Sequence, residues 1–142
     1  MSAQYTLHPY PYREGGALEA ARALRVPPRE MVKTLVMETD RGEAFLLLMP
    51  GDRRVSLKRL ARALGVKNVS TVAPREAERL TGYRVGGISP YGTKRPLPVY
   101  VDKSILQLDR LYVNGGRRGL VVELTPRTLL ETLRPTPVHA AG

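Results

Sequence analysis

The stretch KTLVMETDRGEAFLLLM, residues 33–49, decides the fold class. Its two halves, Lys33–Thr39 and Glu43–Met49, are rich in the apolar and β-branched residues that favour strands. Asp40-Arg41-Gly42 between them is a turn sequence, so the stretch predicts a β-hairpin. Hairpins contain antiparallel strands, and they therefore favour a mixed or largely antiparallel sheet over a purely parallel one.

Helical and strand patterns are interspersed irregularly in the rest of the chain. Apolar spacing together with capping and breaking residues predicts four helices, at residues 17–26, 56–65, 74–82 and 125–133. Further strands are predicted at residues 68–72, 99–102, 110–114 and 119–124. Residues 1–12 are expected to be an extended entry and residues 134–142 a frayed tail. The pattern as a whole predicts an α+β fold with six or seven strands.

The composition sets limits on the class of protein. A chain of 142 residues has the size of one domain, so residues 1–142 are expected to form a single domain. The longest apolar run, Ala44 to Pro50, is far shorter than the roughly 20 residues that span a bilayer. Because the N-terminus resembles no secretory leader, we expect a soluble protein of the cytoplasm with no membrane partner.

The absence of cysteine restricts the chemistry that the chain can perform. Without Cys there is no disulfide, no thiolate nucleophile and no Cys-based metal site. The two histidines, His8 and His139, lie near opposite ends of the chain. We therefore expect no metal and no cofactor.

The charge is strongly positive, with 23 Lys and Arg residues against 13 Asp and Glu residues and a net charge of +10. An excess of this size on a small domain favours a polyanionic partner such as nucleic acid. The alternative is the charge-rich surface of a thermophilic protein, but such a surface carries both signs in balance. The missing balance favours the nucleic-acid partner.

Residues 83–98 have no usable periodicity and contain the glycine-rich stretch Gly86-Gly87-Ile88-Ser89-Pro90-Tyr91-Gly92. Glycines allow close approach of a ligand and can point consecutive N–H groups into one concavity, as an oxyanion requires. A tight structural connection would use the same residues, so both interpretations remain open. The spacing fits neither the dinucleotide-binding fingerprint nor a P-loop.

Lys33 and Thr34 open the first strand of the hairpin. Lysines at strand ends are usually solvated, whereas a lysine at the mouth of a sheet can neutralise a phosphate or hold a ribose. Thr34 adds a hydroxyl beside it. The residues alone leave these alternatives open.

Four blocks of sequence identify a family. They are Val32–Leu35, Thr81–Lys94, Leu97–Asp102 and Tyr112–Leu120. With these blocks in order, the chain resembles the YbaK/prolyl-tRNA-synthetase-associated domain family from about Tyr5 to Leu133. Members of this family are trans-acting deacylases that clear mischarged tRNA(Pro).

The resemblance implies a fold and a set of roles. It implies a mixed, barrel-like sheet flanked by helices and an enzyme that uses no metal. Lys33 would be essential and would contact the 3′ end of the charged tRNA, with Thr34 shaping the pocket. The backbone at Gly86, Gly87 and Ile88 would polarise the ester carbonyl. Ser89, Pro90 and Tyr91 complete the expected substrate-binding loop.

The Gly-Gly-x-Ser-Pro-x-Gly form resembles the branch that removes cysteine from tRNA(Pro), in which the thiol of the substrate is thought to attack the ester. Two positions depart from that branch. Asn114 stands where a small hydroxyl residue is usual, and Val121 stands where an aspartate is common. Both are expected to line the substrate pocket, and both bear on which amino acid is accepted.

The leading hypothesis is an aminoacyl-tRNA deacylase for Cys-tRNA(Pro), with alanine or another small amino acid as the fallback substrate. Its partners would be tRNA and, as a second candidate, prolyl-tRNA synthetase. Side chains expected to steer the acceptor stem are Lys58, Arg59, Lys94, Arg117 and Arg118. One rival is a non-catalytic tRNA-binding or synthetase-associated module of the same fold. Another is a hydrolase of free small molecules, for which the charge would have no purpose.

Overall fold

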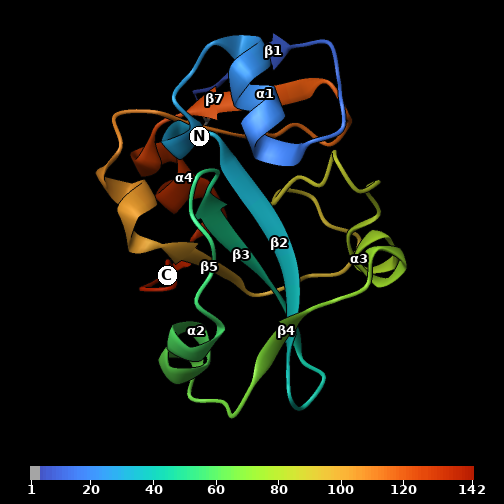
Figure 1. Cartoon of the computed structure of the whole chain (residues 1–142), viewed down its shortest axis with the longest axis vertical. Coiled ribbons are helices and arrows are strands. Elements are labelled where there is room, and N and C mark those ends of the chain that lie inside the picture. Colours follow the sequence, from blue (N-terminus) through green and yellow to red (C-terminus); the bar gives the residue numbers. More distant parts are fainter. Residues whose placement is uncertain (1–3) are drawn as a thin grey trace.

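Two open β-sheets form the framework of the computed structural model, which describes residues 4–142 (Figure 1). The larger sheet has the strand order β4-β2-β3-β5-β8, and the smaller has the order β1-β7-β6. Their bounds are β1 (Thr6–Pro9), β2 (Val32–Thr39), β3 (Ala44–Pro50), β4 (Val69–Thr71), β5 (Val99–Asp102), β6 (Leu111–Asn114), β7 (Leu120–Leu124) and β8 (Thr136–Val138). An isolated parallel bridge between Met31 and Tyr112 links the two sheets where β2 begins.

The predicted hairpin is confirmed as the centre of the larger sheet. Strands β2 and β3 pair antiparallel, with Lys33 opposite Met49 and Glu38 opposite Ala44. Strand β3 then pairs parallel with β5, and β5 pairs parallel with β8, so the sheet is mixed. The run from Phe45 to Met49 is buried on both faces because helices and the second sheet cover both sides of β3.

The four predicted helices are present as α1 (Gly16–Leu24), α2 (Leu57–Leu64), α3 (Pro74–Thr81) and α4 (Pro126–Leu133). Two short 3₁₀ turns, η1 (Pro28–Glu30) and η2 (Lys103–Gln107), also occur. Helix α2 packs on the Phe45 and Leu47 face of the sheet, and α3 packs on the Leu46 face. Within residues 4–142, no helix has the length and apolar character needed to cross a membrane.

Two expectations about the sheets need correction. The described residues form eight strands instead of six or seven, because the extended entry pairs with β7 as the edge strand β1. The expected barrel-like sheet is not observed, since the strands form two open sheets and neither closes on itself. The α+β class and the mixed pairing are confirmed.

The prediction of a frayed tail at residues 134–142 was wrong. Strand β8 extends the larger sheet, and Ala140 and Ala141 are buried. The N–H groups of these two alanines donate to Asp102 Oδ1 at 2.8 and 2.9 Å. The sequence gives no local sign of this contact, because the carboxylate that fixes the tail lies 38 residues earlier.

Asp102 itself is almost fully buried, at 2% exposed. Burial is the largest influence and raises the pKa of its carboxyl. Hydrogen bonds from Ser104, Ala140 and Ala141 outweigh it and hold the pKa below its usual value. The ionised form is therefore the one that the fold stabilises.

We expect Asp102→Asn to lower the free energy of unfolding by about 1–3 kcal/mol at neutral pH, because the amide is a weaker acceptor than the carboxylate. Urea denaturation measures the difference. Exposed Asp109, for which no ion pair is recorded in the described chain, provides Asp109→Asn as the matched control, with an effect near zero.

The difference in the free energy of unfolding between wild type and Asp102→Asn should depend on pH. A depressed pKa in the folded state stabilises the protein above the unfolded value, near 4, and this stability is lost as the pH falls through the folded value. The difference between wild type and Asp102→Asn should therefore shrink below pH 4. A difference that stays constant from pH 7 to pH 3 would contradict this role for the carboxylate.

Candidate functional site

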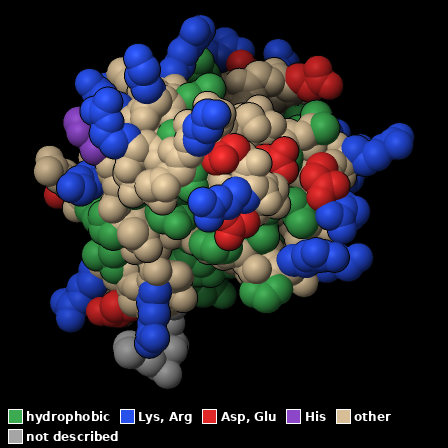
Figure 2. Space-filling view, turned by 90° about the horizontal axis from the view of Figure 1, so that it is seen from below, with side chains coloured by type: hydrophobic (Ala, Val, Ile, Leu, Met, Phe, Trp, Pro, Cys, Tyr) green, Lys and Arg blue, Asp and Glu red, His purple; other side chains and the backbone are tan. Residues whose placement is uncertain are grey.

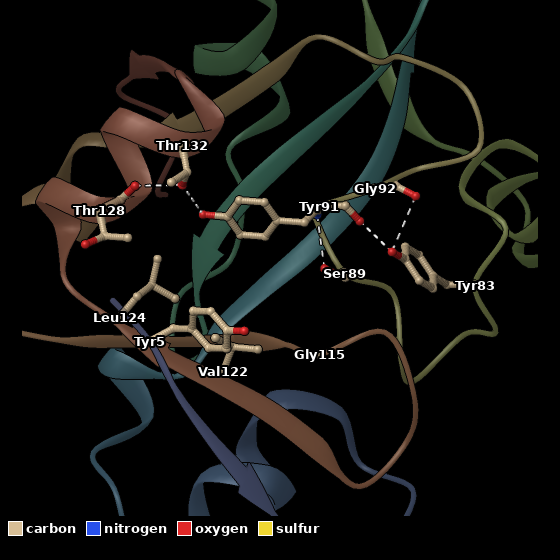
Figure 3. A pocket seen from close by; sticks show the side chains of 10 residues that line it. All are labelled: Tyr5, Tyr83, Ser89, Tyr91, Gly92, Gly115, Val122, Leu124, Thr128 and Thr132. Carbon is tan, nitrogen blue, oxygen red and sulfur yellow. Dashed lines mark hydrogen bonds between the residues drawn. The ribbon is translucent and has the colours of Figure 1, made fainter. Parts of the chain in front are cut away.

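The loop from Gly86 to Gly92 separates two pockets. The first, which we call the lysine pocket, has a volume of about 300 Å³ and is lined by Lys33, Thr34, Gly86, Ile88, Asn114 and Val121 together with residues of the N-terminal segment and α1. The second, which we call the tyrosine pocket, has a volume of about 420 Å³ and is lined by Tyr5, Tyr83, Ser89, Tyr91 and their neighbours (Figure 3).

The lysine pocket is built where the two sheets meet. Strand β2 supplies Lys33 and Thr34, directly after the bridge that Met31 makes to Tyr112. Asn114 on β6 pairs with Val121 on β7, so these two residues are held side by side. Strand pairing therefore brings Lys33 and Val121, which are 88 positions apart in the sequence, to one pocket. The family resemblance predicted this grouping.

Lys33 is a half-buried cation. Burial lowers the pKa of its ammonium group below the usual value; nearby Asp52 opposes this effect, and Arg54 adds to it. No acidic side chain is among the described residues that line the pocket. The pocket therefore offers a positive charge with no internal counter-ion, which suits a phosphate or an ester oxygen.

The hydroxyl of Thr34 is buried without a hydrogen-bond partner among the described residues. A buried polar atom left unpaired costs about 1–3 kcal/mol, so such atoms are rare in native structures and usually mark a ligand or a water. Thr34 lines the lysine pocket beside Lys33. Its hydroxyl is therefore an unused hydrogen-bonding group in the wall of that pocket.

Gly86 and Gly87 allow two chain segments to pack closely together. The sequence alone did not distinguish this role from close approach of a ligand. Gly86 has φ +97°, and a Cβ there would lie 2.5 Å from the Tyr12 hydroxyl. A Cβ on Gly87 would lie 2.7–2.8 Å from backbone atoms of Arg117 and Arg118. Two chain segments thus meet at a distance that only glycine permits.

The expected donor role of Gly87 needs correction. Its N–H donates to the carbonyl of Arg84 at 2.9 Å, and Gly87 does not line the lysine pocket. Gly86 and Ile88 do line it, and no acceptor for their N–H groups is recorded within residues 4–142. The Ile88 side chain is buried against Leu46 and Leu80, which fixes the loop on the sheet.

The rest of the predicted substrate loop faces away from Lys33. Ser89 and Tyr91 line the tyrosine pocket, and Pro90 is buried and lines neither pocket. Sequence spacing could not reveal this division, because an irregular loop has no fixed alternation of side chains. The predicted site is therefore one pocket around Lys33 with a second pocket behind the loop.

The five basic residues expected to bind tRNA do not form one patch. Arg118 donates from Nε to the Val85 carbonyl at 2.9 Å and lies 5.1 Å above the Tyr12 ring, so it holds the loop in place. Arg59 on α2 donates to the Ala141 carbonyl at 2.8 Å. Lys58 lies on the same helix, which is at the opposite end of the molecule from β1 and β7 (Figure 1).

Lys94 and Arg117 are the two candidates near the loop that remain exposed, and neither has a carboxylate partner among the described residues. Figure 2 shows Lys and Arg side chains spread over one face with acidic side chains among them. On this face the positive charge is therefore interspersed with negative charge.

Sequence reasoning missed Tyr10 and Tyr12, which line the lysine pocket from the N-terminal segment. The Tyr10 N–H donates to the Gly119 carbonyl at 2.8 Å, and burial raises the pKa of the Tyr10 phenol, which keeps it neutral. The alternation Tyr10-Pro11-Tyr12 is a signal of extended backbone that could have placed both rings on one side. Among residues 4–142, no three His, Asp or Glu side chains are grouped closely enough to hold a metal.

Comparison with known proteins gives consistent matches. A family model described as "Aminoacyl-tRNA editing domain" matches residues 16–132. The chain is 32% identical over 132 residues to an Enterococcus faecalis protein named "Putative Cys-tRNA(Pro)/Cys-tRNA(Cys) deacylase EbsC", a match covering 87% of this chain and 80% of the relative. It is 33% identical over 96 residues to the proline–tRNA ligase of Desulfotalea psychrophila, covering 68% of this chain and 16% of the ligase.

The fold has a close counterpart among solved structures. The crystal structure described as "a putative trans-editing enzyme for prolyl tRNA synthetase" superposes with a TM-score of 0.87 at 29% identity. The match covers 97% of this chain and 87% of that one. The two-sheet α+β architecture is therefore shared with that structure.

We expect Thr34→Val to raise the free energy of unfolding by about 1 kcal/mol, because it removes a buried, unpaired hydroxyl while keeping its shape. Urea denaturation measures the change. Thr125→Val is the control of opposite sign: the Thr125 hydroxyl accepts from the Thr128 N–H at 3.1 Å, and loss of this cap should cost about 1 kcal/mol. Destabilisation by Thr34→Val would mean that its hydroxyl is already paired in the folded protein.

Proposed function

Because this chain belongs to the aminoacyl-tRNA editing domain family, we propose that it hydrolyses the ester bond of a mischarged tRNA. The observation that carries the proposal is the lysine pocket, whose lining combines half-buried Lys33 with Thr34, which has an unpaired hydroxyl, and with Gly86 and Ile88, whose N–H groups have no recorded acceptor within residues 4–142. Such a set of donors suits the negative charge of a phosphate and of a developing oxyanion. It supports a deacylase more directly than it supports any redox or transfer reaction.

The geometry supports a role for each of these groups in the proposed reaction. Lys33 binds the terminal phosphate or ribose of the tRNA, since it is the one cation among the described residues that line the pocket. The N–H groups of Gly86 and Ile88 polarise the ester carbonyl. Thr34 donates its hydroxyl to the same end of the substrate. In this proposal Gly87 acts by packing, because its N–H is already bonded to Arg84.

The proposed substrate is tRNA(Pro) carrying cysteine. The relative from Enterococcus faecalis supports this choice by its name, and the pocket supports a small uncharged side chain because Val121 and Ala20 form part of its wall. A substrate thiol that attacks its own ester carbonyl carbon forms a cyclic thioester, while the carbon–oxygen bond to the ribose breaks and the thiol proton passes to the ribose oxygen. Water then opens the cyclic thioester to release cysteine, so neither step needs a protein nucleophile. Intramolecular attack of this kind can contribute on the order of 7–11 kcal/mol in favourable cases.

Asn114 and Val121 favour a second candidate, a deacylase for alanine or another small amino acid. With no carboxylate in the lining, the pocket has no acidic group to meet the ammonium of the aminoacyl moiety. The side-chain carbonyl of Asn114 is one acceptor that can meet it, beside the hydroxyls of other residues in the lining. If neither Cys-tRNA(Pro) nor tRNA(Pro) carrying another small amino acid is hydrolysed, the chain is a non-catalytic tRNA-binding or synthetase-associated module of the same fold.

The proposed setting is translational quality control in the cytoplasm, without metal or cofactor. The partner is the acceptor end of tRNA, and prolyl-tRNA synthetase is a second candidate partner. The similarity to part of a proline–tRNA ligase supports the choice of tRNA(Pro).

We expect Lys33→Ala to lower kcat/KM for Cys-tRNA(Pro) about 100-fold, the loss typical of removing one charged or oxyanion-type donor. The assay follows release of amino acid from Cys-, Ala- and Pro-tRNA(Pro) prepared in parallel. Lys103→Ala is the matched control, since Lys103 is an exposed lysine on η2 that lines no pocket near the loop.

The three aminoacyl-tRNAs distinguish the two candidate substrates from each other and from a non-catalytic module. Turnover of Cys-tRNA(Pro) alone supports the leading substrate, and turnover of Ala-tRNA(Pro) supports the second. Equal rates for wild type and Lys33→Ala would remove Lys33 from the mechanism. Binding of all three without turnover would establish the non-catalytic module.

The affinity for tRNA should fall as salt rises, since Lys and Arg contacts to phosphates release counterions on binding. Because only a few basic side chains lie near the pocket, we expect a shallow slope of log Kd against log salt, corresponding to about two to four phosphate contacts. Filter binding of deacylated tRNA(Pro) between 50 and 300 mM KCl measures it. Affinity that is independent of salt would exclude phosphate contacts as a source of binding.

A further inference from the structure

Most of the net charge of the chain comes from one segment around α2. Residues 53–75 contain seven Lys and Arg side chains and no Asp or Glu, so they carry seven of the ten net positive charges. These side chains are Arg53, Arg54, Lys58, Arg59, Arg62, Lys67 and Arg75. A segment with a single sign of charge attracts a partner of the opposite sign.

Contacts within the fold account for part of this segment. Arg53 donates to the Gly142 carbonyl at 2.9 Å and Arg59 to the Ala141 carbonyl at 2.8 Å, so both hold the C-terminal residues. Arg75 lies on α3, which packs on the other face of the larger sheet. The remaining four side chains are exposed, and no carboxylate partner is recorded for them within residues 4–142: Arg54, Lys58, Arg62 and Lys67.

Three of these four cations line a groove between α2 and β4. The groove has a volume of about 520 Å³, and Lys58, Arg62 and Lys67 line it together with apolar side chains of both elements. No acidic side chain is among the described residues that line it. Asp40 contacts its edge, where Oδ1 accepts from the N–H groups of Lys67 and Asn68 at 3.2 and 3.3 Å. That carboxylate holds the backbone of the turn before β4, and the groove keeps an excess of positive charge.

The groove lies on the same face of β2 as Lys33. Lys33 and Met37 are four positions apart on the strand, and residues an even number apart face the same way. Met37 belongs to the core cluster on which α2 packs, and so does Met49, the residue opposite Lys33 on β3. Lys33 therefore lies on the side of the larger sheet that α2 covers.

Arg54 lies between Lys33 and the groove. Burial has the largest effect on the pKa of the Lys33 ammonium group and lowers it, Asp52 opposes this effect, and Arg54 is close enough to add to it. Along the chain, Arg54 comes three residues before the start of α2. Cations thus continue from the lysine pocket to the helix.

The length of β2 sets the distance between the lysine pocket and the groove. From Lys33 to Thr39, which pairs with the groove residue Val69, the strand spans roughly 20 Å at about 3.3 Å per residue. A duplex strand places one phosphate about every 3.4 Å, so this distance corresponds to about six nucleotides. A ligand that reaches both places has the length of a short duplex stem.

We propose that Arg54, Lys58, Arg62 and Lys67 form a track, which we call the α2 track, for the phosphates of the tRNA acceptor stem as it leaves the lysine pocket. The choice of RNA as the polyanion rests on the proposed function. Contacts to phosphates position a nucleic acid without reading its sequence, so the track orients the stem of any tRNA. It supplies about one or two of the two to four phosphate contacts expected above.

The test measures binding of deacylated tRNA(Pro) to the double variant Arg62→Ala/Lys67→Ala over the same range of KCl. We expect Kd to rise about 5- to 20-fold at low salt and the slope of log Kd against log salt to fall by about one to two units, because two phosphate contacts are lost. Both positions are exposed, and alanine favours the helix at Arg62, so the fold is kept.

Lys103→Ala/Arg134→Ala is the matched control. It removes one lysine and one arginine at exposed positions that do not line the groove, and it should leave Kd and the slope almost unchanged. Equal Kd values and equal slopes for the two double variants would overturn the proposal. So would loss of binding to phosphatidylserine vesicles in Arg62→Ala/Lys67→Ala with unchanged affinity for tRNA, because the groove would then face a membrane surface.

A shorter ligand distinguishes the track from the lysine pocket. The trinucleotide CCA, which has no duplex stem, is too short to extend from Lys33 to the groove. Its Kd, measured by NMR titration, should be the same for wild type and Arg62→Ala/Lys67→Ala. A loss as large as that for tRNA(Pro) would overturn the proposal, since the variant would then act on the lysine pocket itself.

The outcome is distinguishable from that of the proposed function. Affinity for tRNA(Pro) that depends on Arg62 and Lys67, in a protein that hydrolyses none of the three aminoacyl-tRNAs, would support the α2 track and exclude the deacylase. Hydrolysis that depends on Lys33, with no effect of Arg62→Ala/Lys67→Ala on Kd or on the salt slope, would support the deacylase and exclude the track.

Discussion

The pairing of β2 with β3 is the interaction on which the rest of the structure depends. Strand β3 is buried on both faces, so its side chains anchor three layers: Leu47 contacts the layer of α2, Leu46 the layer of α3 and Ile88, and Leu48 the layer of the smaller sheet and α4. Because β2 is fixed on β3, Lys33 and Thr34 are fixed at the junction of the two sheets. The position of Lys33 and Thr34 thus depends on the hydrophobic packing around β3.

Sequence patterns predicted the parts of the fold that are determined locally. The β2–β3 turn, the Ser56 and Thr125 caps and the glycine that ends α2 all act within a few residues, and each is found as expected. Strand β8 could not be predicted, because it depends on β5 and on the Asp102 carboxylate, which are distant in sequence. The same holds for β1, whose exposed residues have no apolar alternation and are ordered by pairing with β7.

The sequence pointed to residues that line the candidate site, but not to how they are arranged. Family blocks pointed to Lys33, Thr34, Asn114 and Val121, and strand pairing does bring these four around one pocket. Within the irregular loop, however, neighbouring residues face different cavities, and the hydrogen bond of Gly87 to Arg84 is a feature of one particular turn. Arg118 was predicted as a tRNA contact and Tyr12 was missed, and their stacking, which supports that turn, joins segments that are distant in sequence.

The glycine loop also affects how this protein can change over evolutionary time. As a wall shared by two pockets, it cannot move to enlarge one of them without reducing the other, and Gly87 leaves no room for a side chain against Arg117. Substitutions on the paired strands β6 and β7 are free of this conflict. Changes in the shape of the lysine pocket are therefore easiest at the paired strand positions that line it, Asn114 and Val121.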